Sequence, residues 1–129
     1  EAYHGGEMIV VDFGGLELRA ELRETPTARA IAELLPIEAK VSTWGREVFF
    51  PARARVELEP EAREVVSAGE IAFWPGGGYI AIGFGTTPAS QADEIRLAAP
   101  VNVFADTDDD VTRLETVQMG TTVRLYRAD

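Results

Sequence analysis

The 129-residue chain contains no cysteine and a single histidine. Without cysteine the chain can form no disulfide, no thiol nucleophile and no cysteine-ligated metal site, so ordinary core packing must stabilise the fold. The one histidine, His4, lies near the start of the chain, and Ser90 therefore has no histidine within the expected fold to activate it. A serine hydrolase triad is not supported.

Basic residues are also scarce, with 12 lysines and arginines against 22 acidic residues and a net charge of -10. This charge repels nucleic acid backbones and anionic membrane surfaces, so we expect neither as a partner. The densest basic stretch, residues 46–55, alternates arginine with apolar residues, a pattern more typical of one solvated strand face than of a binding stripe.

No apolar run approaches the ~20 residues that span a bilayer, and residues 1–6 lack the basic-then-apolar order of a secretion signal. We expect a cytoplasmic protein. The content of 46% hydrophobic and 26% charged residues is that of a globular chain. The length suits one domain, predicted as residues 8–129 after a flexible tail of residues 1–7.

Alternation of apolar and polar residues dominates the chain and predicts strands. A hairpin is expected from residues 8–13 and 16–22, joined by Gly14 and Gly15. Further strands are predicted at residues 37–43, 46–50, 53–58, 69–75, 79–85, 101–105 and 121–126. For residues 59–66 we favour a short turn. The fold class predicted is all-β, a closed barrel of about eight strands with one or two short helices.

The firm helix prediction begins at Thr25, a good N-cap, followed by Pro26 at the first helical position. Its apolar face consists of Ala28, Ile31, Ala32 and Leu35, and Pro36 ends it. A single apolar stripe cannot form a core alone, so the helix should cover an open end or one face of the sheet. A second, short helical turn is expected at residues 111–117.

Residues 86–100 are small and polar and are predicted to form a long loop, which in a compact domain is more often functional than idle. The acidic stretch of residues 106–110 suggests calcium at first sight. However, Val111 and Val117 occupy the positions where a calcium loop needs glycine and glutamate. We expect a solvated turn with Asp110 capping a helix, no metal site and no cofactor.

Three stretches resemble the cyclophilin-like proteins of bacteria and archaea. The first combines residues 27–36 with the Trp44-Gly45 turn and residues 46–50. The second and most specific combines residues 69–75 with Gly78, residues 84–85 and residues 87–90. The third consists of residues 102–103 and 120–123. Together they span nearly the whole chain.

The resemblance implies the closed barrel of the peptidyl-prolyl isomerases. In those enzymes an arginine stabilises the twisted amide, and a dry groove weakens its conjugation. The phenylalanine-histidine-arginine signature of true cyclophilins is absent here, where the comparable strand reads Val48-Phe49-Phe50-Pro51. The prediction is therefore a domain that binds a small molecule or a short, proline-containing peptide in a groove. The alternative is an active isomerase that uses Arg46, Arg53 or Arg55 as a non-standard catalytic arginine.

The candidate ligand-binding residues are apolar groove residues and polar groups near them, a combination that ligand sites use for affinity and orientation. They are Trp44, Glu47, Phe50, Trp74, Tyr79, Phe84, Thr86, Thr87, Ser90, Gln91 and Asn102. Alternation places Phe49 and Phe50 on opposite faces of one strand, so one of them should be core. Glu47 and Arg46 could serve as a general base or an anion clamp, or form an exposed hairpin pair. A module that acts only with a partner subunit is a third hypothesis, and the oligomeric state is open.

Overall fold

The computed structural model describes residues 6–128. Within these residues the elements are β1 (Met8–Asp12), β2 (Glu17–Leu22), α1 (Pro26–Leu34), β3 (Ile37–Lys40), β4 (Ser42–Thr43), β5 (Glu47–Pro51), β6 (Arg63–Val66), β7 (Glu70–Trp74), β8 (Tyr79–Gly83), β9 (Ile95–Thr107), the 3-10 helix η1 (Val111–Thr116) and β10 (Thr122–Arg127). No helix among them is long and apolar enough to cross a membrane.

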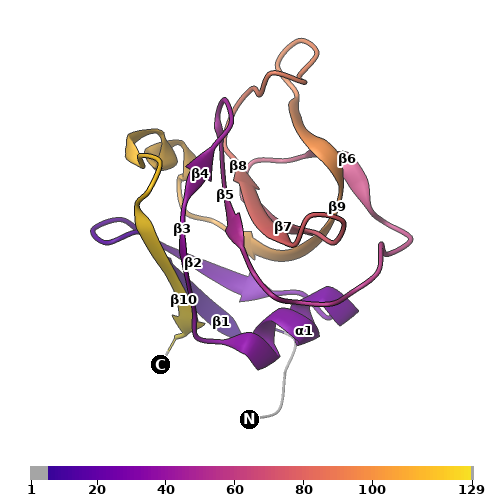
Figure 1. Ribbon diagram of the computed structural model, residues 1–129, viewed down its shortest axis with the longest axis vertical. Coiled ribbons are helices and arrows are strands. Elements are labelled where there is room, and N and C mark those ends of the chain that lie inside the picture. Colours follow the sequence, from indigo (N-terminus) through magenta and orange to yellow (C-terminus); the bar gives the residue numbers. More distant parts are fainter. Residues whose placement is uncertain (1–5, 129) are drawn as a thin grey trace.

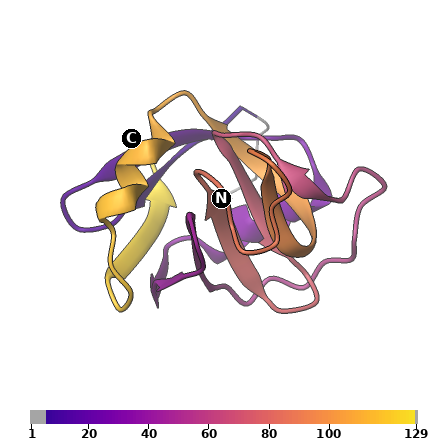
Figure 2. The same ribbon diagram turned by 90° about the horizontal axis from the view of Figure 1, so that it is seen from above.

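The strands form one antiparallel sheet that curls around a core (Figures 1 and 2). Its hydrogen-bonded order is β3-β10-β1-β2-β9-β7-β8-β5-β4, and β6 pairs with β9 outside this path. The two ends of the path, β3 and β4, are separated by Val41 alone. The all-β prediction is confirmed. Within residues 6–128, however, no strand pairing joins β3 to β4, so the predicted closure is not made by hydrogen bonds.

Helix α1 lies across one end of the sheet (Figure 1), where its buried face meets the core. The Thr25 side chain accepts a hydrogen bond from the Ala28 N–H at 3.0 Å, so the predicted N-cap is confirmed. Arg127 Nη2 in β10 donates to the Ala32 carbonyl at 3.0 Å, which attaches the helix to the last strand. The predicted apolar face is buried at Ala28, Ile31 and Ala32, and Leu35 packs beside it.

Two hydrophobic clusters lie on opposite faces of the sheet. The inner cluster lies on the concave face of the curled sheet and includes Phe50, Phe73 and Phe104. The outer cluster consists of Val66, Ala72, Ala81, Leu97, Val101 and Val103, with Phe49, Trp74 and Ile95 packed against it. Its members come from β6, β7, β8 and β9, so β6 and the first half of β9 cover the outer face of β7 and β8. The candidate functional site lies on this outer face.

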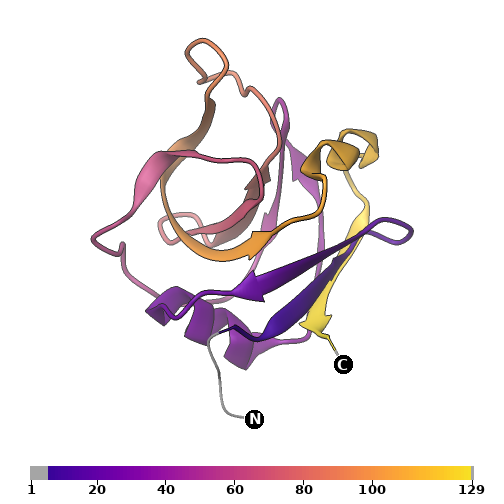
Figure 3. The same cartoon turned by 180° about the vertical axis from the view of Figure 1, so that it is seen from behind.

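Strand β9 is longer than the sequence predicts. Residues 86–100 were expected to form a loop, but the strand already begins at Ile95 and the loop occupies only residues 84–94. The first half of β9 pairs with β6, and its second half pairs with β7 and β2. The register shifts between Ile71 and Ala72 and between Arg63 and Val65. Irregularities of this kind bend a strand, and β9 follows a wide arc around the sheet (Figure 3).

Two further predictions are corrected. Residues 53–58 form no strand, because no neighbouring strand pairs with them, although Ala54 and Val56 pack against the inner cluster. Residues 63–66, expected within a turn, form β6. The helical turn after residue 110 is confirmed as η1, with the Asp110 side chain accepting from the Thr112 N–H at 3.0 Å.

Of the predicted tail of residues 1–7, residues 1–5 lie outside the described part of the chain, and His4 is among them. The two residues that are described continue the pairing beside β2. The Gly6 N–H donates to Leu22 O at 3.0 Å, and the Leu22 N–H donates to Glu7 O at 2.9 Å.

Candidate functional site

An open cavity of about 230 Å³ lies on the outer face of β5 and β8. We call it the aromatic pocket and define it by its lining residues Trp44, Glu47, Phe49, Trp74, Tyr79, Ala81, Leu97, Ala98, Ala99 and Val101. The strand register brings these residues together, because Phe49 lies opposite Ala81 and Trp74 lies opposite Tyr79. The first half of β9 supplies the remaining wall.

The aromatic rings of the pocket pack against one another. The Tyr79 ring stacks on Trp74 with centroids 6.0 Å apart, and its other neighbour, Phe49, meets it edge to face at 5.3 Å. Both arrangements are favourable for aromatic pairs and hold ring orientation. Trp44, Phe49, Trp74 and Tyr79 are nevertheless only partly buried, so each keeps surface available to a ligand.

Two glycines let the walls approach. A Cβ on Gly77 would lie 2.4 Å from the Trp74 ring, so the turn between β7 and β8 forms a seat for that indole only because residue 77 has no side chain. A Cβ on Gly83 would lie 2.4 Å from Ile95 Cγ2 and 3.5 Å from Leu97 Cδ2. Gly83 therefore allows the start of β9 to pack closely on β8.

Glu47 is the one acidic residue in the lining of the aromatic pocket, and it is 6% exposed. Its backbone carbonyl accepts from the Trp44 N–H at 3.0 Å. Within residues 6–128 its carboxylate receives no hydrogen bond and forms no ion pair, unlike Glu70, which binds Arg23 and Arg63. Burial raises the pKa of Glu47 to about 7, because the charged form is deprived of water and no neighbouring charge compensates.

The chain matches the model of the Cyclophilin-like family over residues 7–126. It belongs to this family. The resemblance drawn from the sequence is thus confirmed. No curated protein matches the chain.

Two solved structures place this Cyclophilin-like domain among known folds. The solution structure of a hypothetical protein from Archaeoglobus fulgidus is 37% identical, with 99% of this chain and 100% of that chain covered, and a TM-score of 0.80. The structure of McbB in complex with tryptophan has a TM-score of 0.66 at 12% identity. That comparison covers 92% of this chain but only 44% of McbB, and at this identity it shows the fold alone.

Four of the residues predicted from the sequence meet in the aromatic pocket of the Cyclophilin-like domain, namely Trp44, Glu47, Trp74 and Tyr79. Phe50 instead lies fully buried in the inner cluster, and Phe84 packs against the same cluster. Of the two neighbouring phenylalanines, the candidate residues included Phe50 rather than Phe49, and they did not include Ala81 or the β9 segment from Leu97 to Val101. Alternation along β5 contained the signal for Phe49, since it shares a face with Glu47.

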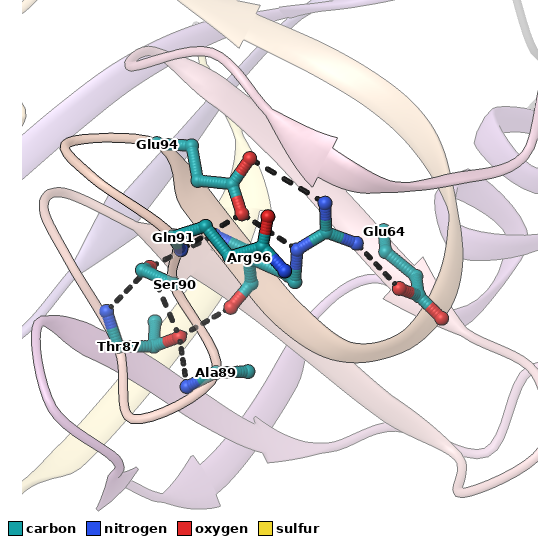
Figure 4. Close-up of polar contacts among 7 residues, drawn as sticks. All are labelled: Glu64, Thr87, Ala89, Ser90, Gln91, Glu94 and Arg96. Atoms are coloured by element: carbon teal, nitrogen blue, oxygen red, sulfur yellow. Dashed lines mark hydrogen bonds and ion pairs between the residues drawn. The ribbon is translucent and has the colours of Figure 1, made fainter.

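The predicted loop residues bond to one another rather than lining the pocket (Figure 4). The Ser90 hydroxyl accepts from the Thr87 N–H at 2.9 Å, and Thr87 Oγ1 donates to the Arg96 carbonyl. The Gln91 N–H donates to Glu94 Oε2 at 2.9 Å. Thr86 accepts from the Arg46 N–H through its carbonyl, also at 2.9 Å. These hydrogen bonds, within the loop and to Arg46 and Arg96, hold residues 84–94 in place.

Asn102 is 1% exposed and lies beside α1, and it does not line the aromatic pocket. Its amide nitrogen donates to Thr27 Oγ1 and to the Glu57 carbonyl, both at 2.9 Å. Its amide oxygen accepts from the Glu59 N–H at 2.9 Å. All the hydrogen-bonding atoms of this side chain are thus engaged in linking three parts of the fold.

The three candidate arginines are exposed, and none lines the aromatic pocket. Arg46 forms an ion pair with Glu115 of η1. Arg53 and Arg55 belong to the segment without strand pairing, where Arg55 borders a wide groove beside α1. Within residues 6–128 no group of three or more histidine, cysteine or acidic side chains is arranged to hold a metal ion.

Proposed function

We propose that this domain binds a small molecule, or one side chain of a short peptide, in the aromatic pocket. The observation that carries the proposal is the cavity of about 230 Å³ between partly exposed aromatic rings, with a single acidic group in its wall. Ligand sites typically combine an apolar concave surface with a few polar groups that orient the ligand. A cavity of this size suits one ring system rather than a long chain.

The known fold neighbours add one ligand to consider. McbB, whose likeness here is in fold, is described in complex with tryptophan. Indoles therefore belong in a first panel of probes, together with simple phenyl compounds. Isomerase activity is the weaker proposal, because it needs an arginine beside the bound proline and the candidates Arg46, Arg53 and Arg55 do not line the pocket.

Intrinsic fluorescence provides the test. The chain has two tryptophans, and both Trp44 and Trp74 line the aromatic pocket. Titration with the neutral probe 2-phenylethanol should change their emission and saturate. Ala99→Phe, which places a ring in the cavity mouth, should weaken this binding by at least about tenfold, since the ligand loses the contact area that stabilises it.

The matched control is Ala68→Phe, the same change at an exposed turn residue outside the pocket lining. This variant should bind like the wild type. If neither 2-phenylethanol nor any indole changes the emission, or if both variants bind unchanged, the pocket is not a ligand site.

We also propose that side-chain packing around Val41 closes the barrel where hydrogen bonding does not. Val41 is 1% exposed, and its N–H donates to Thr121 O at 2.9 Å while its carbonyl accepts from the Gly120 N–H at 2.8 Å. Strand β3 also contacts β5 across this position. Closure of this kind would support the β5 wall on which Glu47 and Phe49 stand.

A further inference from the structure

Glu47 points to the chemical class of the ligand. Its backbone role, pairing β5 with Gly83 and accepting from Trp44, would be served by any residue. The carboxylate adds nothing to that role and is costly, since a buried charge without a partner is strongly disfavoured relative to an apolar side chain. A side chain that costs the fold stability without serving its backbone role indicates a contact with a ligand.

The described chain supplies no cation for this carboxylate. Arg46, the next residue, is directed to Glu115, and Arg96, just before the β9 wall, is held by Glu64 and Glu94. The other ionisable residue in the lining is Tyr79, which carries no positive charge at neutral pH. Residues 6–128 therefore supply no positively charged partner for Glu47 in the lining of the pocket.

The surroundings of Glu47 favour a cation. Trp44, Trp74, Phe49 and Tyr79 line the pocket, and aromatic rings attract ammonium groups through the ring quadrupole. The net charge of -10 adds a long-range attraction for positively charged ligands. A carboxylate that is only 6% exposed in an apolar wall binds an N–H donor more strongly than one in water, because little solvent competes.

We propose, on the basis of the proposed function, that the aromatic pocket is a site for an amine whose apolar ring fills the cavity and whose protonated nitrogen binds the Glu47 carboxylate. The rise in the Glu47 pKa to about 7 agrees with this geometry. An ammonium group brought to the carboxylate reverses that rise, so binding of the amine is coupled to loss of a proton from Glu47.

Three probes of similar shape test the proposal: 2-phenylethylamine, 2-phenylethanol and 3-phenylpropionate, titrated into the full chain near neutral pH with tryptophan emission as the readout. The wild type should bind the amine at least about tenfold more tightly than the alcohol, given the strength of hydrogen bonds to charged groups. The carboxylate probe should bind most weakly. In Glu47→Gln the preference for the amine over the alcohol should disappear.

A pH series on the wild type gives a second, independent measurement. As the pH falls from about 8 to about 5, Glu47 takes up a proton and the affinity for the amine should drop, whereas the affinity for the alcohol should not. Glu47→Gln should show no such drop. Neither measurement depends on a damaging substitution, since glutamine keeps the shape of glutamate.

The outcomes separate the two proposals. If the alcohol binds and Ala99→Phe blocks it, but the amine has no advantage or keeps its advantage in Glu47→Gln, the amine proposal is overturned and the pocket stands. If none of the three probes binds to the wild type, both proposals fail. An amine preference that requires Glu47 and decreases with falling pH supports the amine site.

Discussion

Glu47 and Phe49 share one face of β5, yet burial acts on them in opposite ways. Covering Phe49 removes apolar surface from water and stabilises the fold. Covering Glu47, which is 6% exposed, deprives a carboxylate of solvation that no described neighbour replaces. The stability of the fold therefore depends on pH through the single residue Glu47.

We expect the free energy of unfolding of the wild type to decrease, through Glu47, as the pH rises from about 5 to about 8. The folded-state pKa of Glu47 is about 7, above the ordinary value of 4.5, so between these values the folded state binds more protons than the unfolded state. Glu47→Gln removes this dependence. It should be more stable than the wild type by roughly 2–3 kcal/mol at pH 8 and by little near pH 5.

Chemical denaturation at the two pH values measures the effect, with Glu33→Gln, an exposed carboxylate on α1, as the matched control. The difference between control and wild type should be small and the same at both values. A Glu47→Gln variant that is equally or less stable than the wild type at pH 8 would contradict an uncompensated buried charge.

The sequence predicts which residues of a strand share a face, but it does not predict which of the two faces is turned to the core. Alternation correctly placed Phe49 and Phe50 on opposite faces of β5, but it could not say which one joins the inner cluster. That depends on which face β9 covers, and β9 is distant in sequence. For the same reason Trp44, Glu47, Trp74 and Tyr79, each close to a strand end, were identified from local pattern, whereas Leu97 and Val101 were not.

At the scale of elements, local signals predicted what local interactions determine. The N-cap of α1, the β1–β2 hairpin and η1 all depend on residues within a few positions of each other, and all are confirmed. Strand identity at residues 53–58 and 63–66 depends instead on whether a partner strand lies alongside. β6 exists because the first half of β9 reaches it, and no pattern within either segment carries that information.

The contact between β8 and β9 rests on Gly83. We expect Gly83→Ala to destabilise the fold by about 1–3 kcal/mol, because the added methyl would meet Ile95 Cγ2 at 2.4 Å in a well-packed region. Movement of the β9 wall should also shift the emission maximum of Trp74. Thermal denaturation and fluorescence of the same sample measure both effects.

Gly15→Ala serves as the control, since a Cβ at Gly15 meets no atom within 4 Å. Its stability should lie within about 0.5 kcal/mol of the wild type, as for most exposed substitutions. Equal stabilities of the two variants would show that β9 can retreat from β8 without cost.

At the scale of the whole molecule, Asn102 joins parts of the chain that are far apart in sequence. It connects β9 to Thr27 in α1 and to the backbone of Glu57 and Glu59. The Glu59 carboxylate in turn accepts from the Thr27 N–H at 3.0 Å and from its hydroxyl at 2.5 Å. This network adds hydrogen bonds to the apolar packing that holds the helix over one end of the sheet.

Replacing Asn102 should therefore lower the stability of the entire domain. We expect Asn102→Ala to cost about 2–3 kcal/mol, because buried groups lose their partners. Asn102→Asp should cost more, since it removes both N–H donors and adds a second carboxylate near Glu59. Denaturation curves should remain a single transition, and binding of 2-phenylethanol to the folded variants should be unchanged. An Asn102→Ala variant as stable as the wild type would contradict this role.

The short strands at the two ends of the hydrogen-bonded path have a consequence for how copies of this protein meet one another. An exposed strand edge is a template on which a second molecule can extend the ladder, which is how fibrils begin. Here one edge belongs to β4, which has two residues, another to β3, which has four and carries exposed Glu38 and Lys40, and a third to β6, which has four and begins with exposed Arg63. Within residues 6–128 each of these edge strands is thus too short to be a good template for a fibril.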